Sequence, residues 1–260
     1  FCFDAKLQRL YAIRERHSDG QVINELVAIE LASKKVSVLQ SGFDFYSFPR
    51  LSPAGDRLCW TCWDQPDMPW DAAELWLADI HLDGSLDAAH KVSGGDGVCI
   101  FQPAWSSDNV LHYISDAGNW SNLYSHRDGV LNALAPIDRD FATPQWIFGL
   151  ATYVINPDNS LYALEFEAGH QKLSHIDPQI GHVEPIELPF SHFNGPLLGD
   201  GDNLYFCAAS PTQEASIYRY ELATKKLTPL VKPSEFILDS NNISVAQALT
   251  FESKSESKSE

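Results

Sequence analysis

The sequence predicts an all-β protein, a β-propeller of four-stranded blades with about five blades in an incomplete ring. Short apolar segments that end in a polar residue recur about every 45 to 50 residues, and a proline-led signal precedes four of them. Repeats of about 40 to 50 residues with four strands each are typical of propeller blades. No amphipathic run is long enough for a helical solenoid. The alternative is an ordinary β-sandwich whose spacing is coincidental.

Each blade is predicted from the same succession of segments. The proline-led signal comes first, followed by a middle strand, the recurring strand with its polar end, a turn and a fourth strand. The proline-led signals begin at Pro49, Pro103, Pro144 and Pro196. The middle strands are expected at 9–15, 58–63, 110–115, 151–155 and 203–208, the recurring strands at 26–30, 75–79, 123–126, 173–177 and 217–221, and fourth strands at 36–40 and 227–231.

These segments divide the chain into a propeller over residues 1–233 and a connector with a polar tail over 234–260. The five blades are expected at 1–42, 43–97, 98–138, 139–190 and 191–233. One further strand is expected at 243–251, and residues 252–260 contain only Ser, Lys and Glu, which cannot form a core. The first residues, Phe1 to Asp4, resemble the middle of a domain, so we expect the chain to be a fragment.

Charge and cysteine content restrict the partners and the compartment. The net charge of -17 would repel a phosphate backbone, so no nucleic-acid partner is expected, and it would favour a cationic ligand such as a peptide amine. The alternative is that the acidic surface binds no particular ligand and only keeps the protein in solution. No apolar run reaches the length of a membrane span, so no membrane partner is expected. Five cysteines at irregular spacing indicate a reducing compartment, and a cytoplasmic location is predicted.

Local motifs for catalysis or cofactor binding are absent from the sequence. It contains no Gly-x-Ser-x-Gly, no glycine-rich phosphate loop and no clustered histidines, so no catalytic residue, metal or cofactor is predicted. Cys59 and Cys62 lie in one expected strand, where side chains alternate, so they should point to opposite faces and serve a structural role. The seven tryptophans are expected to pack mostly between blades.

Residues 51–80, LSPAGDRLCWTCWDQPDMPWDAAELWLADI, carry a resemblance to a known family. They resemble the propeller of the prolyl oligopeptidase family of serine peptidases, in its acylaminoacyl-peptidase and dipeptidyl-peptidase-like branch. Segments 101–124 and 140–153 look like the same branch, and the resemblance extends over about residues 20 to 230. Departures occur in turns and loops: Ala54, Gln65 and Asp67 replace the usual residues, and Ser107-Asp108-Asn109 lacks the usual Asp-Gly.

The resemblance implies a non-catalytic module of a serine exopeptidase or oligopeptidase. In that family the propeller is followed by an α/β-hydrolase domain of the same polypeptide, which holds a Ser-Asp-His triad and would lie outside residues 1–260. The propeller would gate the access of short peptides to that domain. The alternative is a freestanding propeller that acts as a protein-interaction scaffold. A propeller glycosidase, with Asp44 and Asp140 as candidate carboxylates, is a third possibility.

The candidate substrate-binding residues are Trp70, Asp71 and Glu74, in an acidic loop that also contains Asp64 and Asp67. In the dipeptidyl-peptidase branch, propeller carboxylates hold the amine of the substrate by charge-assisted hydrogen bonds. The resemblance therefore implies that Asp71 and Glu74 contact a peptide amine beside Trp70. The alternative is that Asp71 caps a short turn over 72–75, since Asp is a favoured N-cap residue.

Overall fold

The computed structural model describes residues 1–231, 242–247, 249 and 251, and in this part of the chain it contains twenty β-strands and no α-helix. The strands form five four-stranded antiparallel sheets, each built from four consecutive strands. The first two sheets contain β1 (Cys2–Asp4), β2 (Arg9–Ser18), β3 (Gln21–Glu30) and β4 (Val36–Ser41), then β5 (Phe45–Leu51), β6 (Arg57–Trp63), β7 (Glu74–Asp79) and β8 (His90–Gly94).

The remaining three sheets repeat this meander. The third sheet contains β9 (Ile100–Trp105), β10 (Leu111–Ser115), β11 (Asn122–Arg127) and β12 (Val130–Ala133). The fourth contains β13 (Tyr153–Ile155), β14 (Leu161–Glu167), β15 (His170–Asp177) and β16 (His182–Pro185). The fifth contains β17 (His192–Gly199), β18 (Asn203–Ser210), β19 (Gln213–Glu221) and β20 (Lys226–Pro229).

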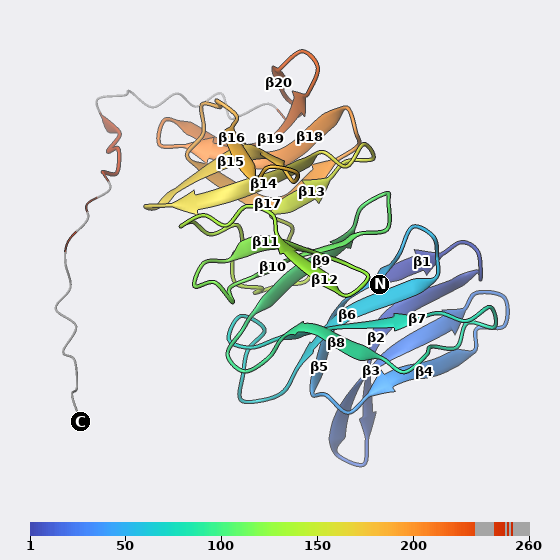
Figure 1. The fold of residues 1–260 in the computed structure, drawn as a ribbon. Coiled ribbons are helices and arrows are strands. Elements are labelled where there is room, and N and C mark those ends of the chain that lie inside the picture. The colour runs from blue at the N-terminus through green and yellow to red at the C-terminus, as the bar shows by residue number, and fades with distance from the viewer. Residues whose placement is uncertain (232–241, 248, 250, 252–260) are drawn as a thin grey trace, which may run out of the picture.

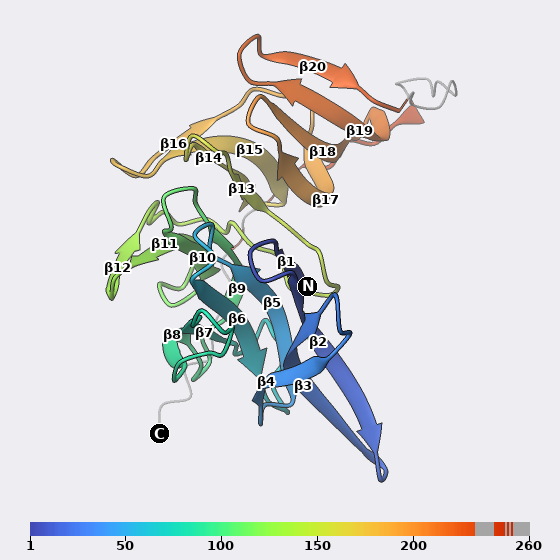
Figure 2. The same ribbon diagram turned by 90° about the vertical axis from the view of Figure 1, so that its right-hand side faces the viewer.

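The sheets follow one another as the blades of a propeller. The first strand of each sheet packs against neighbouring sheets, as β5 does against β9 and β13 against β17. Figures 1 and 2 show the succession from the first sheet to the last, and the described strands of these two sheets do not close a ring. The predicted all-β propeller of about five blades in an incomplete ring is therefore confirmed. The limits of the predicted domains, including the division at residue 233, stay a prediction.

The proline-led signal corresponds to a bulge in the first strand of three blades. Phe48, Gln102 and Gly195 directly precede a proline and have positive φ angles of 46°, 49° and 83°. At each of them the register with the second strand shifts. Proline cannot donate a ladder hydrogen bond, so it is tolerated at a bulge within a sheet. The proline-led signal that recurs in the sequence therefore marks a β-bulge that recurs in these three blades.

The fourth blade departs from the prediction. Residues 151–155 were expected to form its middle strand, but β13 (Tyr153–Ile155) is the first strand and β14 (Leu161–Glu167) is the middle one. Pro144 lies outside any strand, in the linker 134–152, nine positions before β13 begins at Tyr153. The prediction was wrong because this proline-led signal belongs to a long linker and not to a bulge. The described residues of the expected strand at 243–251 form no strand, and residues 252–260 lie outside the described part.

The antiparallel order of the strands gives the propeller two different ends. Turns between first and second strands lie at one end, which we call the hairpin end. The linkers between blades and the connections between second and third strands lie at the other, the loop end. At the hairpin end, Asn109 and Asn159 adopt φ angles of 62° and 67°, at the place where the second blade has Gly55. Asparagine tolerates this left-handed conformation, which explains why the third blade needs no Asp-Gly.

The two asparagines also join neighbouring blades. The Oδ1 atom of Asn109 accepts a hydrogen bond from the amide of Ala54 at 3.0 Å. The Oδ1 atom of Asn159 accepts one from the amide of Ser107 at 3.1 Å. Each bond connects the hairpin of one blade with that of the next, so a chain of similar contacts runs along the hairpin end.

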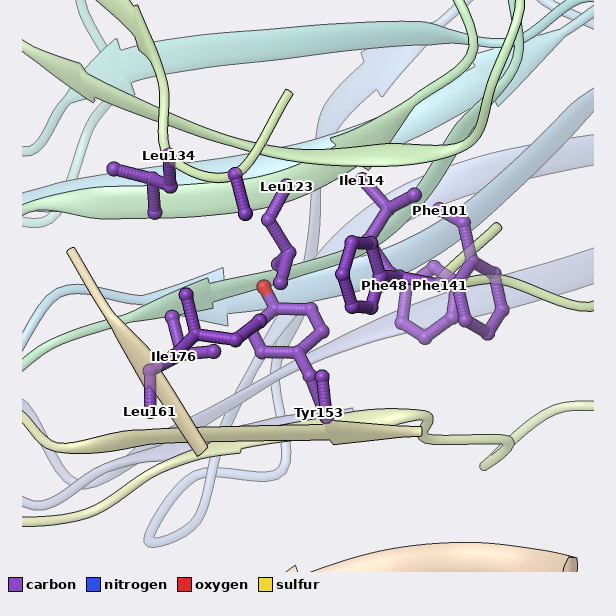
Figure 3. Close-up of a cluster of buried hydrophobic side chains, with 11 residues drawn as sticks. Phe48, Phe101, Ile114, Leu123, Leu134, Phe141, Tyr153, Leu161 and Ile176 are labelled. Carbon is purple, nitrogen blue, oxygen red and sulfur yellow. The ribbon is translucent and has the colours of Figure 1, made fainter. Parts of the chain in front are cut away.

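The core between the second, third and fourth blades is rich in aromatic side chains (Figure 3). Phe48 and Phe101 from two bulged strands meet edge to face with their ring centroids 5.8 Å apart, and Tyr153 of β13 joins the same cluster. Burying one such side chain stabilises a fold by about 1.5 to 3 kcal/mol. Cys59 and Cys62 belong to two different clusters on opposite faces of β6, as predicted. None of the described segments is a helix suited to crossing a membrane.

Candidate functional site

The loop 64–73 connects β6 with β7 at the loop end and carries the three predicted residues. Its base is held by the carboxylates of two aspartates, each of which accepts a hydrogen bond from a backbone amide. The amide of Asp44 donates to Oδ1 of Asp64 at 2.6 Å, and the amide of Gln65 donates to Oδ2 of Asp44 at 3.0 Å. The loop is therefore tied to the start of the innermost strand of its own blade.

Asp71 closes the turn that precedes it. Its Oδ2 atom accepts a hydrogen bond from the amide of Met68 at 3.1 Å, while the carbonyl of Met68 accepts the amides of Asp71 and Ala72. The alternative role as N-cap of a turn over 72–75 is wrong, because β7 begins at Glu74 and Leu75 is already in the sheet. Asp71 is exposed, and its other oxygen accepts no hydrogen bond from a described residue.

Glu74 is already engaged within its own sheet. Its Oε2 atom accepts a hydrogen bond from the indole nitrogen of Trp76 at 2.8 Å, and its Oε1 atom lies 3.1 Å from the ammonium nitrogen of Lys91. The carboxylate is partly buried, and Lys91 offsets its charge. A ligand amine would have to compete with Lys91 for Glu74, whereas it would meet Asp71 without such a competitor.

Trp70 packs against a residue from a distant part of the sequence. Its ring centroid lies 4.3 Å from that of Trp146, at an interplanar angle of 47°. Trp146 belongs to the linker between the third and fourth blades. We call residues 145–149 of this linker the strap. The strap crosses to the second blade, where Nε2 of Gln145 donates to the buried hydroxyl of Ser47 at 2.9 Å.

The strap presents an apolar tip between two buried anchors. Trp146, Ile147 and Phe148 are 70%, 65% and 74% exposed. The second anchor is Gln102, whose side chain accepts the amide of Thr152 at 2.7 Å and donates to the carbonyl of Tyr153 at 2.6 Å. The sequence reasoning assigned the tryptophans to packing between blades and missed this tip. The signal in the sequence was the apolar run from Trp146 to Phe148, which lies outside any strand.

Other acidic and polar residues of the loop end position the backbone. Asp140 accepts the amide of Ser121 at 2.9 Å, and Asp116 accepts the amide of Cys99 at 2.7 Å. Asp44 has the role described above. Asp44 and Asp140, the candidate carboxylates of the glycosidase hypothesis, are therefore both engaged in positioning loops.

The thiol of Cys99, which contacts the loop, is protonated and unsuited to nucleophilic chemistry. The Cys99 Sγ atom donates to the carbonyl of Pro69 at 3.3 Å. Burial raises the pKa of this thiol to about 12, so it is protonated and a poor nucleophile at neutral pH. The loop end thus offers an exposed carboxylate, an aromatic pair and an apolar tip, which suit binding.

Comparison with known proteins shows which solved structures this propeller is similar to. No protein-family model matches the sequence, and no curated protein matches it either. Among solved structures, a puromycin-hydrolysing peptidase of Mycobacterium tuberculosis is 27% identical, with a TM-score of 0.83, and the match covers 92% of this chain and 38% of that one. A puromycin hydrolase is 24% identical with a TM-score of 0.81, covering 89% of this chain and 37% of that one.

A more distant match comes from a study of two prolyl endopeptidases, with 14% identity and a TM-score of 0.61, covering 84% of this chain and 32% of that one. The resemblance to the propellers of prolyl oligopeptidase-family peptidases is therefore confirmed at the level of structure. This chain spans less than two-fifths of the length of each of these three peptidase structures.

Proposed function

We propose that the chain is the non-catalytic propeller of a serine exopeptidase or oligopeptidase and that it gates the access of short peptides to a hydrolase domain of the same polypeptide. The observation that carries the proposal is the match to the puromycin-hydrolysing peptidase over 92% of this chain. A narrow propeller channel would admit short unfolded peptides and exclude folded proteins. Hydrolysis would take place in the partner domain, through a serine nucleophile, a histidine base and an orienting aspartate.

The loop end is the face that we propose for the peptide. Asp71 would accept the amine of the substrate, and Trp70 with Trp146 would contact an apolar side chain. Glu74 would contribute negative potential, while Lys91 holds its side chain in place. The net charge of -17 supports a cationic group as the ligand. The assignment to the acylaminoacyl-peptidase or dipeptidyl-peptidase branch and the cytoplasmic location belong to the same proposal.

A freestanding interaction scaffold is the second candidate, and the exposed strap tip favours it. The two candidates differ in what the full-length protein does. We expect it to hydrolyse short peptides in a reaction that a serine-directed phosphonate blocks. A full-length protein without this activity, whose strap binds another protein, would instead support the scaffold.

The amine contact is tested in the full-length protein with Asp71→Asn. We expect KM for a short peptide with a free amine to rise about tenfold, which corresponds to about 1.4 kcal/mol of lost binding. KM for the same peptide with an acetylated amine should not change. Asp67→Asn is the matched control, because Asp67 lies in the same loop and is also exposed. Equal effects of Asp71→Asn on both peptides would refute the contact.

A further inference from the structure

A pocket of about 430 Å³ lies between the first two blades and the strap. Its wall is mostly apolar: the polar side chains that line it are those of Ser47 and Arg50, and Arg50 is the only charged side chain among the described residues of the wall. Its lining includes Ala12 and Ile13 of β2, Phe48, Pro49 and Arg50 of β5, and Phe148 of the strap. The pocket is separate from the acidic loop 64–73, none of whose residues lines it.

Arg50 has no carboxylate within 4.0 Å among the residues that the structure describes, although the chain is strongly acidic. Its guanidinium lies 5.3 Å from the ring centroid of Phe48 and donates one hydrogen bond, at 3.1 Å, to the carbonyl of Pro49. Six other arginines have a carboxylate within 4.0 Å, and Arg9 donates to two backbone carbonyls. Arg9 lines a different pocket, in which Glu30 and Asp83 also lie, whereas the pocket lined by Arg50 contains no carboxylate from the described residues.

The ionisable neighbours of Arg50 do not supply the missing charge. The guanidinium acts electrostatically on Cys2, Cys59 and Tyr153. Burial raises the pKa of all three groups, to about 12 for Cys59, so they are neutral at pH 7. A half-buried cation without an anion nearby favours an anionic ligand.

The internal repeat shows that the fold does not require an arginine here. Arg50 follows the proline of the bulge in the second blade, and the residues at the same place in the third and fifth blades are Ala104 and Leu197. The bulge therefore forms with an apolar residue at this position. In the second blade the bulge bends β5, and Arg50 lies in the wall of the pocket.

We propose that this pocket binds a carboxylate attached to an apolar group, of the kind found at the C-terminal residue of a short peptide. The planar guanidinium matches a carboxylate with two parallel hydrogen bonds. The walls formed by Ile13, Phe48 and Phe148 would hold the apolar group. A dianionic phosphate fits less well, because no second cationic side chain from the described part of the chain lines the pocket. The inference goes beyond the proposed function and does not depend on it, because the site consists only of residues of this chain.

The test is calorimetric titration of the 260-residue chain with two probes, N-acetylphenylalanine and its neutral amide. We expect the acid to bind at least tenfold more tightly than the amide. Arg50→Met should abolish this preference. Arg57→Met is the matched control and should keep it, because Arg57 also lies over an aromatic ring, 4.9 Å from Trp105, and donates to a backbone carbonyl, but outside the pocket.

A second variant keeps the test valid if Arg50→Met does not fold. Phe148 is 74% exposed, so Phe148→Ala should leave the fold intact. It should weaken the acid and the amide by a similar factor and preserve the preference between them. No binding of the acid, equal affinity for the two probes, or affinities that neither Arg50→Met nor Phe148→Ala changes would each overturn the proposal.

Discussion

The hairpin end and the loop end of the propeller are built from the same strands but differ in the length and regularity of the connections between them. At the hairpin end, short turns of similar shape repeat, and Asn109 and Asn159 join neighbouring hairpins. At the loop end, the connections differ in length, and the strap reaches from the linker between the third and fourth blades back to the second blade. The hairpin end thus joins neighbouring blades by repeated contacts, whereas the loop end leaves the tip of the strap exposed, and exposed loops of this kind are common places for binding residues.

The largest effect should come from the anchor that holds the strap in the core. Gln102→Leu removes the acceptor for the amide of Thr152 and the donor for the carbonyl of Tyr153, both buried. Leaving two buried backbone groups unpaired should lower the free energy of unfolding by about 3 kcal/mol. Urea denaturation measures this loss. Gln40→Leu, in the outer strand of the first blade, serves as control, and an equally small loss for both variants would mean that Gln102 is not an anchor.

The next effect depends on pH. Burial lowers the pKa of His112 from 6.5 to about 4, so the folded state binds fewer protons than the unfolded state between these values. Stability from the neutral histidine is therefore present above pH 6.5 and is lost as the pH falls towards 4. Between pH 7 and pH 5 the loss should be about 2 kcal/mol.

His112→Gln should reduce that loss, because glutamine does not titrate. The measurement is urea denaturation of both proteins at pH 7 and pH 5, with the exposed His170→Gln as control. If the variant loses as much stability as the original chain over this interval, burial of His112 does not cause the acid sensitivity.

A smaller effect tests the joints of the hairpin end. Asn109→Ala places alanine at a φ of 62° and removes the acceptor for Ala54, so we expect a loss of about 1 to 2 kcal/mol. Asn109→Gly removes the same hydrogen bond but accepts the backbone conformation, so its loss should be below about 1 kcal/mol. Thermal unfolding distinguishes the two. Equal losses would show that the backbone conformation contributes nothing.

The smallest effect is expected at the strap tip. Ile147 is 65% exposed, and Ile147→Ser should change the free energy of unfolding by less than about 0.5 kcal/mol. Leu164→Ser, at a buried position of β14, is the contrasting control and should destabilise the fold strongly. A large loss for Ile147→Ser would mean that the tip is part of the core, and the two ends would then no longer differ as described.

Local features of the fold could be predicted from the sequence, and contacts between distant segments could not. The strands and turns follow from alternating apolar residues and from turn residues such as Pro53 and Gly55, which act over a few positions. The proline-led signal was recognised, but the bulge behind it was not, and Pro144 was therefore misassigned. Periodicity carries no information about where a long linker runs after it leaves a strand.

The candidate site was predictable to the same limited extent. Resemblance selected the loop that carries Trp70, Asp71 and Glu74, but it did not indicate that Lys91 pairs with Glu74 or that Trp146 packs on Trp70. Both partners depend on tertiary packing. The bonds made by Gln102 and Gln145 are of the same kind, since each joins two blades and neither residue stands out in the sequence.

The central claim, that the loop end and not the hairpin end meets the substrate, is tested most directly by photocrosslinking in the full-length protein. The crosslinking amino acid p-benzoylphenylalanine would be placed at position 146 of the strap or at position 54 of the hairpin end. A labelled short peptide with a free amine should be captured at position 146 and not at position 54. Capture at position 54 alone, or equal capture at both positions, would contradict the account.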